Sequence, residues 1–280
     1  MREIAVTDVT KAVKKLCMDA NYNLNPDVLR ALRQGAAREE SPQGAQILES
    51  LIENAEIARK KQVPICQDTG MLLLFVQVGQ EVHFTGGSLE AALQEGVRQG
   101  YAEGYLRKSV VGDPLRRENT KDNTPAVIYY ELAEGDQVKL TALPKGFGSE
   151  NMGGVRMLKP SQGVEGVIDF VVETVEKAGP NPCPPIVVGV GIGGSMDKAA
   201  LLSKQALARP VDSEHPDPYY ADLERLLLQK INDTGIGPQG LGGRITALGV
   251  NVETFPTHIA GLPVAVTISC HVTRHSEAIL

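Results

Sequence analysis

Short β-rich runs alternate with helical patterns along most of this chain, and the alternation limits the folds open to it. The β-rich runs cover residues 72–78, 126–132, 137–142, 186–190, 245–252 and 263–269. Apolar residues at helical spacing fall between some of these runs, over 164–178, 196–208 and 217–231. This pattern predicts an α/β (mixed α+β) fold with at least one mixed sheet and helices packed on it.

The first hundred residues are predicted to be helical. Apolar residues, among them Ile4, recur at roughly helical spacing over 3–20. Asn25 and Ser41 each stand directly before a proline, the order expected where a helix begins. A further helix is expected to begin after Ser88. The sequence therefore predicts a helical N-terminal region followed by the mixed sheet.

Composition and charge exclude several classes of function. The net charge is −6 with dispersed basic residues, and aromatic residues make up 4% with no tryptophan, so neither a basic patch nor a stacking platform for nucleic acid is expected. No apolar run is long enough to span a bilayer, and the N-terminus lacks the apolar core of a secretory signal. We expect a cytoplasmic protein with one domain over 1–280 and an exposed loop near 209–218.

The four cysteines are of two kinds. Cys17 lies on the apolar face of a predicted helix and is expected to be a buried core residue. Cys66, Cys183 and Cys270 lie at strand edges or in loops, where side chains can converge. Their separations lack the C-x-x-C pattern of common metal sites, so spacing alone is weak evidence for a metal. If the three converge, they suit an iron–sulfur cluster better than zinc, and an iron without a protein ligand could bind a substrate hydroxyl or carboxylate.

Glycine is concentrated in three clusters, 146–154, 189–194 and 235–243. Such clusters form tight turns or allow the backbone to approach a ligand closely. The second cluster matches the G-x-G-x-x-G pattern of dinucleotide sites. However, prolines and charged residues over 209–218 stand where the ribose-binding strand of such a site would lie, so a dinucleotide site is not favoured.

Six segments together resemble one family along nearly the whole chain, the class I iron–sulfur fumarate hydratases and L-tartrate dehydratases. They are ICQDTG (65–70), LRKSVVGDPLRRENTKDNTPA (106–126), LPKGFGSENMG (143–153), CPPIVVGVGIGGSMDKAALLSK (183–204), INDTGIGPQGLGG (231–243) and PTHIAGLPVAVTISCHVTRH (256–275). The resemblance implies an enzyme that adds water to a dicarboxylate double bond or removes it. It implies fumarate hydration to S-malate first, with dehydration of L-tartrate to oxaloacetate as the alternative.

The resemblance also implies roles for individual residues. It assigns a [4Fe-4S] cluster to Cys66, Cys183 and Cys270, and it makes Asp68 and His258 the candidates for proton transfer. The residues it implies for substrate binding are Gln67, Arg107, Lys145, Gly146, Gly148 and Ser149. Arg107 suits a substrate carboxylate because a guanidinium fork matches both oxygens. Less specific candidates are Arg116 and Arg117, together with His271 and His275, which flank Cys270 and could shield or tune the cluster.

Single-chain members of this family carry a further C-terminal domain, which two-subunit members place on a separate β chain. This sequence resembles the free α subunit, so the expected partner is a β subunit in an α2β2 heterotetramer. Two other classes stay open. One is a non-catalytic iron–sulfur or redox-sensing protein, and the other is a zinc-stabilised structural module; neither explains why Asp68, Arg107, Lys145 and His258 accompany the cysteines.

Overall fold

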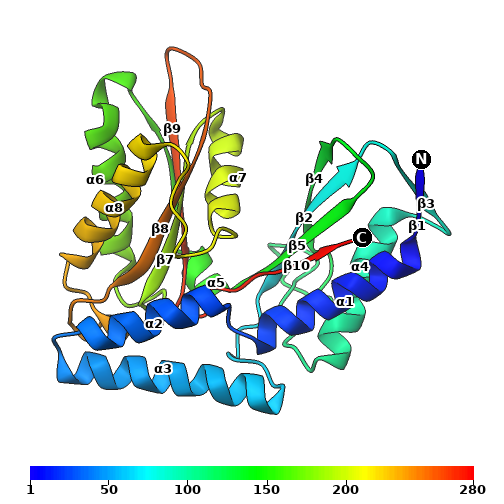
Figure 1. Ribbon diagram of the computed structural model, residues 1–280, viewed down its shortest axis with the longest axis horizontal. Helices are drawn as coiled ribbons and strands as arrows, with labels where there is room; N and C mark the ends of the chain where they lie inside the picture. The colour runs from blue at the N-terminus through cyan, green and yellow to red at the C-terminus, as the bar shows by residue number, and fades with distance from the viewer. The chain divides into compact units, whose positions relative to one another are not determined.

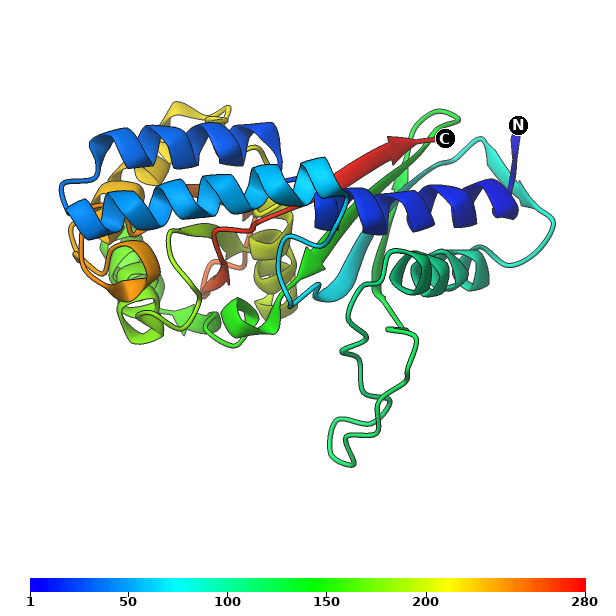
Figure 2. The same ribbon diagram turned by 90° about the horizontal axis from the view of Figure 1, so that it is seen from below.

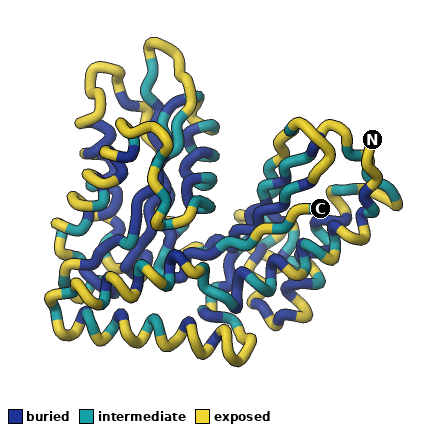
Figure 3. Tube along the Cα trace, in the orientation of Figure 1, coloured by how far each residue is buried: buried dark blue, intermediate teal, exposed yellow.

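The computed structural model describes residues 1–280 and divides into two compact units. Unit 1 comprises Met1–Leu24, Ala55–Phe147 and Arg274–Leu280, and unit 2 comprises Asn25–Asn54 and Gly148–Thr273. Each unit has a hydrophobic core of its own, seen as the dark blue strands in Figure 3. That residues 1–280 form a single domain stays a prediction.

Unit 1 is built on a four-stranded mixed sheet with the strand order β10-β5-β2-β4 (Figure 1). The strands are β2 (Met71–Gly79), β4 (Val127–Ala133), β5 (Val138–Lys145) and β10 (Ser276–Ile279). β2 and β4 run parallel, whereas β5 is antiparallel to both β2 and β10. A separate parallel pair is formed by β1 (Arg2–Ala5) and β3 (Val82–Thr85).

Two helices of unit 1, α1 (Val6–Tyr22) and α4 (Leu89–Glu103), pack on each other and on one face of its sheet. Alternate residues of β2 point into this core because side chains alternate across a strand. Cys17 is fully buried there, as predicted, and burial raises the pKa of its thiol. The helix expected over 3–20 begins only at Val6, because residues 2–5 form the β1 ladder; Ile4 is therefore a strand residue.

Unit 2 contains a second mixed sheet, with the order β6-β9-β7-β8. Its strands are β6 (Gly154–Leu158), β7 (Ile186–Gly193), β8 (Ala247–Phe255) and β9 (Leu262–Ser269). Figure 1 shows α7 (Met196–Ala206) on one face, with α6 (Gly163–Ala178) and α8 (Pro218–Asn232) on the other. The mixed fold class is confirmed, and the three predicted helices of this region are present.

The remaining elements are α2 (Pro26–Arg38), α3 (Pro42–Lys61), α5 (Phe147–Glu150) and two short 3-10 helices, Pro160–Gln162 and Pro238–Gly240. The helices predicted to begin after Asn25 and Ser41 do so, with proline in the first turn. Ser88 caps α4 through its hydroxyl, which accepts a hydrogen bond from the main-chain N–H of Ala91. None of the helices has the length and apolarity needed to cross a membrane.

The two sheets follow the same plan of connections. In unit 1, the central strand β2 has the parallel strand β4 on one side and the antiparallel strand β5 on the other. In unit 2, the central strand β7 has the parallel strand β8 on one side and the antiparallel strand β9 on the other. An edge strand, β10 or β6, completes each sheet. In both units, the start of the central strand therefore lies beside the end of its antiparallel neighbour.

The glycine pattern on β7 is explained by packing. A Cβ on Gly191 would lie 2.0 Å from the carbonyl oxygen of Ala199, and one on Gly189 would lie 2.1 Å from that of Ser203. Both carbonyls belong to α7, which crosses the strand at this point. Glycine is required here because only a residue without a side chain admits the helix so close to the strand.

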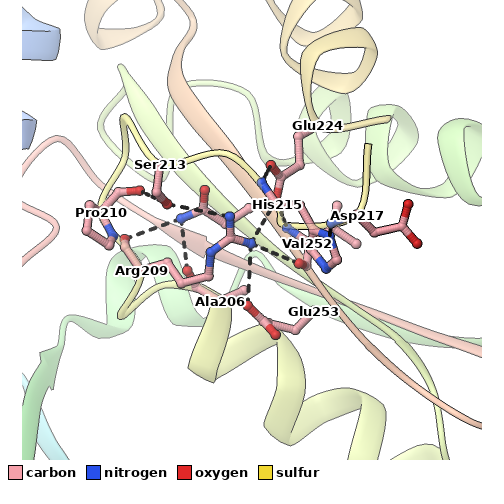
Figure 4. Close-up of polar contacts among 10 residues, drawn as sticks. Ala206, Arg209, Pro210, Ser213, His215, Asp217, Glu224, Val252 and Glu253 are labelled. Carbon is pink, nitrogen blue, oxygen red and sulfur yellow. Dashed lines mark hydrogen bonds and ion pairs between the residues drawn. The ribbon is translucent and has the colours of Figure 1, made fainter. Parts of the chain in front are cut away.

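The loop between α7 and α8 is fixed by a buried ion pair (Figure 4). The Oε1 atom of Glu224, a residue 6% exposed, lies 2.8 Å from Nη1 of Arg209 and accepts a 2.8 Å bond from the Val252 N–H. Its Oε2 atom accepts a bond from the His215 N–H at 3.0 Å. The predicted loop over 209–218 is therefore present as far as Pro218, where α8 begins, and it is tied to α8 and β8.

Candidate active site

The residues Cys66 to Gly70 form a turn in unit 1 just before β2. The Asp68 carboxylate accepts one main-chain hydrogen bond on each oxygen, from Gly70 N–H at 3.0 Å and from Phe147 N–H at 2.9 Å. An aspartate that bonds the backbone two residues on is a common turn device. The bond from Phe147 is not local, however, so it also holds Asp68 against the end of β5. The adjoining Gln67 is exposed, and its Oε1 lies 3.3 Å from the Cys66 Sγ.

Buried polar side chains hold the carbonyls of this turn. The Tyr101 hydroxyl lies 2.9 Å from the Thr69 carbonyl oxygen and 3.0 Å from that of Gly70. Burial raises the pKa of Tyr101, so its hydroxyl stays protonated and can donate. Asn123 donates to the Gly70 carbonyl at 3.1 Å. The turn is thus rigid through contacts that its own sequence does not provide.

Arg107 lies beside this turn. Its main-chain N–H donates to the Thr69 hydroxyl at 2.9 Å, and that hydroxyl donates to the Arg107 carbonyl at 3.2 Å. The side chain is exposed and so can reach a ligand. Arg116 and Arg117 are also exposed but sit in a separate turn around Asp113, and no contact joins them to Asp68.

The end of β5 closes the other side of the turn. Lys145 is 2% exposed, and its ammonium donates to the Gly146 carbonyl at 3.1 Å. Gly70 has a φ of +78°, and a Cβ there would lie 2.7 Å from the Lys145 nitrogen, so glycine is required. A Cβ on Gly146 would lie 3.2 Å from Asp68 Oδ2. The structure therefore brings together Asp68, Arg107, Lys145 and Gly146, four of the predicted residues.

Arg274, which was not predicted from the sequence, also belongs to unit 1 and reaches the turn. Its Nη2 atom donates to the Asp68 carbonyl at 2.6 Å, and the residue is 4% exposed. The sequence offered one signal, its place four residues after Cys270. His275 lies one residue further on and is half-buried.

The segments that carry Cys183 and Cys270 contact each other in unit 2 through His271. The main-chain N–H of His271 donates a hydrogen bond to the carbonyl oxygen of Cys183 at 3.4 Å. The ring Nδ1 of His271 lies 3.0 Å from the same oxygen. Cys183 is exposed and has a φ of +54°. That backbone region is uncommon for a residue with a side chain and tends to occur at functional sites. Gln239, which was also not predicted from the sequence, donates to the Pro184 carbonyl at 2.7 Å.

The other predicted residues of unit 2 lie on α5 and on the loop between β8 and β9. Gly148 and Ser149 lie on α5, exposed and buried respectively. His258 is exposed on the loop between β8 and β9, whereas Cys270 follows the far end of β9. Eight strand residues at roughly 3.3 Å each separate the two by about 25 Å. The structure therefore does not bring His258 to Cys183 and Cys270, and its catalytic role stays a prediction.

The thiols suit metal binding by their chemistry. None of the four cysteines forms a disulfide; Cys66 and Cys270 are half-buried and Cys183 is exposed, in contrast to the buried Cys17. No group of three or more histidine, cysteine or acidic side chains gathers to hold a metal ion. Cys66 belongs to unit 1 and the other two to unit 2, so the convergence of all three stays a prediction.

In unit 1, a carboxylate fixed at both oxygens lies with the buried cations Lys145 and Arg274 and with the half-buried thiol of Cys66, a combination typical of an enzyme site. The chain belongs to the fumarate hydratase (Fumerase) family, whose model matches residues 10–279. The family resemblance predicted from the sequence is thereby confirmed.

The chain is similar to several curated proteins over nearly its whole length. A Methanocaldococcus jannaschii protein with the provisional name L(+)-tartrate dehydratase subunit alpha is 42% identical, with 96% of each chain covered. The L(+)-tartrate dehydratase subunit alpha of Escherichia coli UTI89 is 34% identical, over 98% of this chain and 91% of its own. That of strain K12 is 33% identical, over 100% and 93%. The chain therefore belongs to a family of hydro-lyases.

Proposed function

We propose that this chain is the α-type subunit of an iron–sulfur hydro-lyase acting on a four-carbon dicarboxylic acid, with L-tartrate as its substrate. The observation that carries the proposal is the Asp68 turn, where a fixed carboxylate follows Cys66 by two residues and the exposed Arg107 is bonded to the next residue, Thr69. The names of the relatives favour tartrate over fumarate, which the sequence alone placed first. The family description keeps fumarate hydration as the second candidate.

The residues that would hold a [4Fe-4S] cluster are Cys66, Cys183 and Cys270. Accessible cysteine thiols outside disulfides are the usual ligands of such clusters. When bound, the cluster supplies a Lewis acid for the hydroxyl that leaves as water or enters from it. The same donors could take zinc, and the metal content of the purified protein distinguishes the two.

The roles of the other residues follow from their contacts. The Asp68 carboxylate keeps lone pairs free beyond its two main-chain bonds and can accept a proton from the substrate carbon or orient a water. Arg107 can bind one substrate carboxylate through its guanidinium fork. Gln67 and the N–H groups of Gly146 and Gly148 can donate hydrogen bonds to it, and the buried charge of Lys145 favours an anion nearby.

The relatives carry the name of an alpha subunit, so we propose that a β subunit completes the site, in an α2β2 assembly. In this proposal the β subunit supplies the groups that bind the second carboxylate. His258 and Ser149 keep the roles that the resemblance implies, proton transfer and substrate binding. His258 depends most on the assembly, because it lies far from Cys183 and Cys270 within unit 2.

The test is to co-express the chain with its β subunit, purify the complex without oxygen, and measure iron, acid-labile sulfide and turnover of L-tartrate, fumarate and S-malate. We expect about four irons per α chain, reduced by Cys66→Ser, Cys183→Ser and Cys270→Ser. The matched control is Cys17→Ser, in the core of unit 1. Colourless protein that holds zinc or no metal after anaerobic reconstitution would exclude the cluster. Turnover of fumarate alone would select the second candidate.

A further inference from the structure

The guanidinium of Arg274 is buried in unit 1 with only part of its hydrogen-bonding capacity used. The residue is 4% exposed, and its Nη2 donates to the Asp68 carbonyl at 2.6 Å. Its Nε and Nη1 atoms are buried and have no hydrogen-bond partner. Burying a charged group in this way is unfavourable, and unsatisfied buried donors call for an explanation.

The position of Arg274 beside the Asp68 turn suggests why its guanidinium is buried there. The Asp68 carboxylate is held by the N–H groups of Gly70 and Phe147, so its direction depends on how the Asp68 peptide is oriented. Arg274 holds the carbonyl of that same peptide. A bond from a charged donor is stronger than one between neutral groups, and this one is short. Tyr101 is close enough to be influenced by the charges of both Asp68 and Arg274.

We propose that Arg274 is a positioning residue of the active site, which acts by fixing the Asp68 peptide and, through it, the direction of the Asp68 carboxylate. The two unpaired nitrogens leave a positive charge beside the Asp68 turn that no carboxylate contacts directly. The effect on the turn is a property of this chain alone. Its consequence for catalysis rests on the proposed function, in which Asp68 moves a proton.

Amide hydrogen exchange on the full chain tests the effect on the turn. In Arg274→Met, we expect the amides of Gly70 and Phe147 to exchange at least about ten-fold faster, with the interior of β2 and β5 unchanged. Arg274→Lys keeps the charge and one donor, so it should restore part of the protection; it also serves if the methionine variant does not fold. Unchanged protection at both amides, or a uniform loss across the sheet of unit 1, would overturn the proposal.

Tyr101→Phe is the matched control. It removes a buried hydroxyl from the next two carbonyls of the turn, those of Thr69 and Gly70, and leaves the Asp68 carbonyl bond in place. We expect it to change exchange at Phe147 less than Arg274→Met does. If both variants accelerated amide exchange at Phe147 equally, the loss of any hydrogen bond to the turn would have the same effect. Arg274 would then have no particular role in positioning Asp68.

Kinetics of the assembled enzyme test the catalytic consequence. Arg274→Met should lower kcat at least about ten-fold with KM within about two-fold, and Arg274→Lys should recover part of the loss. A raised KM with unchanged kcat would show that the guanidinium binds substrate instead of positioning Asp68. If the complex of the unsubstituted chain turns over no dicarboxylic acid, the proposed function fails, while the exchange experiment still decides the role of Arg274.

Discussion

Replacing Glu224 with glutamine should destabilise unit 2 strongly, because this carboxylate is buried and accepts three hydrogen bonds. Glutamine keeps the shape but presents an amide NH2 to one of these donors and leaves Arg209 without its main counterion. Breaking a buried ion pair costs about 3–5 kcal/mol. Arg209 keeps the Val252 carbonyl at 3.0 Å, so we expect the lower end of that range, about 3 kcal/mol.

Calorimetry and urea unfolding of the full chain measure this loss, which corresponds to a fall in Tm of about 6–12 °C. Glu253→Gln is the matched control. Glu253 also faces Arg209, but at 3.4 Å and with 31% of its side chain exposed, so its loss should cost less than about 1 kcal/mol. If the two variants had equal effects, the buried network would not be what stabilises this loop.

Two further variants test packing and charge. Gly191→Ala forces a Cβ to 2.0 Å from a carbonyl oxygen of α7, so urea unfolding should show a loss of at least about 1–3 kcal/mol, whereas Gly112→Ala, with no atom nearer than 3.7 Å, should stay within about 0.5 kcal/mol. Equal losses would contradict the packing explanation of the glycine pattern. Burial opposes ionisation of Asp122, but hydrogen bonds from Thr124 and Arg98 lower its pKa to about 2. Its stabilising contribution is thus complete above its ordinary pKa of 3.8 and is lost as the pH falls towards 2. Unfolding midpoints between pH 2 and 5 should show a weaker acid dependence in Asp122→Asn; an identical pH dependence would refute this assignment.

The interior of the fold was largely predictable from the sequence, whereas the short strands at its edges were not. Central strands such as β7 and helices such as α6 bury a regular apolar pattern, which local periodicity reveals. The missed strands β1, β3, β6 and β10 have only four or five residues each. Their pairing depends on distant partners, as between Ser276 and Ala142, and their own residues carry too little pattern to indicate it.

The candidate site shows the same division. The contrast between Cys17 and Cys183 could be predicted from neighbouring residues, because a helix core and a proline-rich loop differ locally. The burial of Arg274 could not be predicted in this way, because an arginine in a polar segment is normally exposed. Its burial accompanies its contact with Asp68, which is distant in the sequence. His258 was assigned by its motif alone, and a motif does not show which end of a sheet a loop occupies.

The pairing of β10 with β5 has a consequence for synthesis on the ribosome. Unit 2 has all its strands once residue 269 has been made, but the sheet of unit 1 waits for residues 276–279. At roughly 5–20 residues per second, β5 remains without this neighbour for about 7–27 s. Chains truncated after Thr273 should therefore keep the thermal transition of unit 2 and lose protease protection over β2 and β5. The acidic turn, which also needs Arg274, is thus among the last parts of the chain to reach its final form.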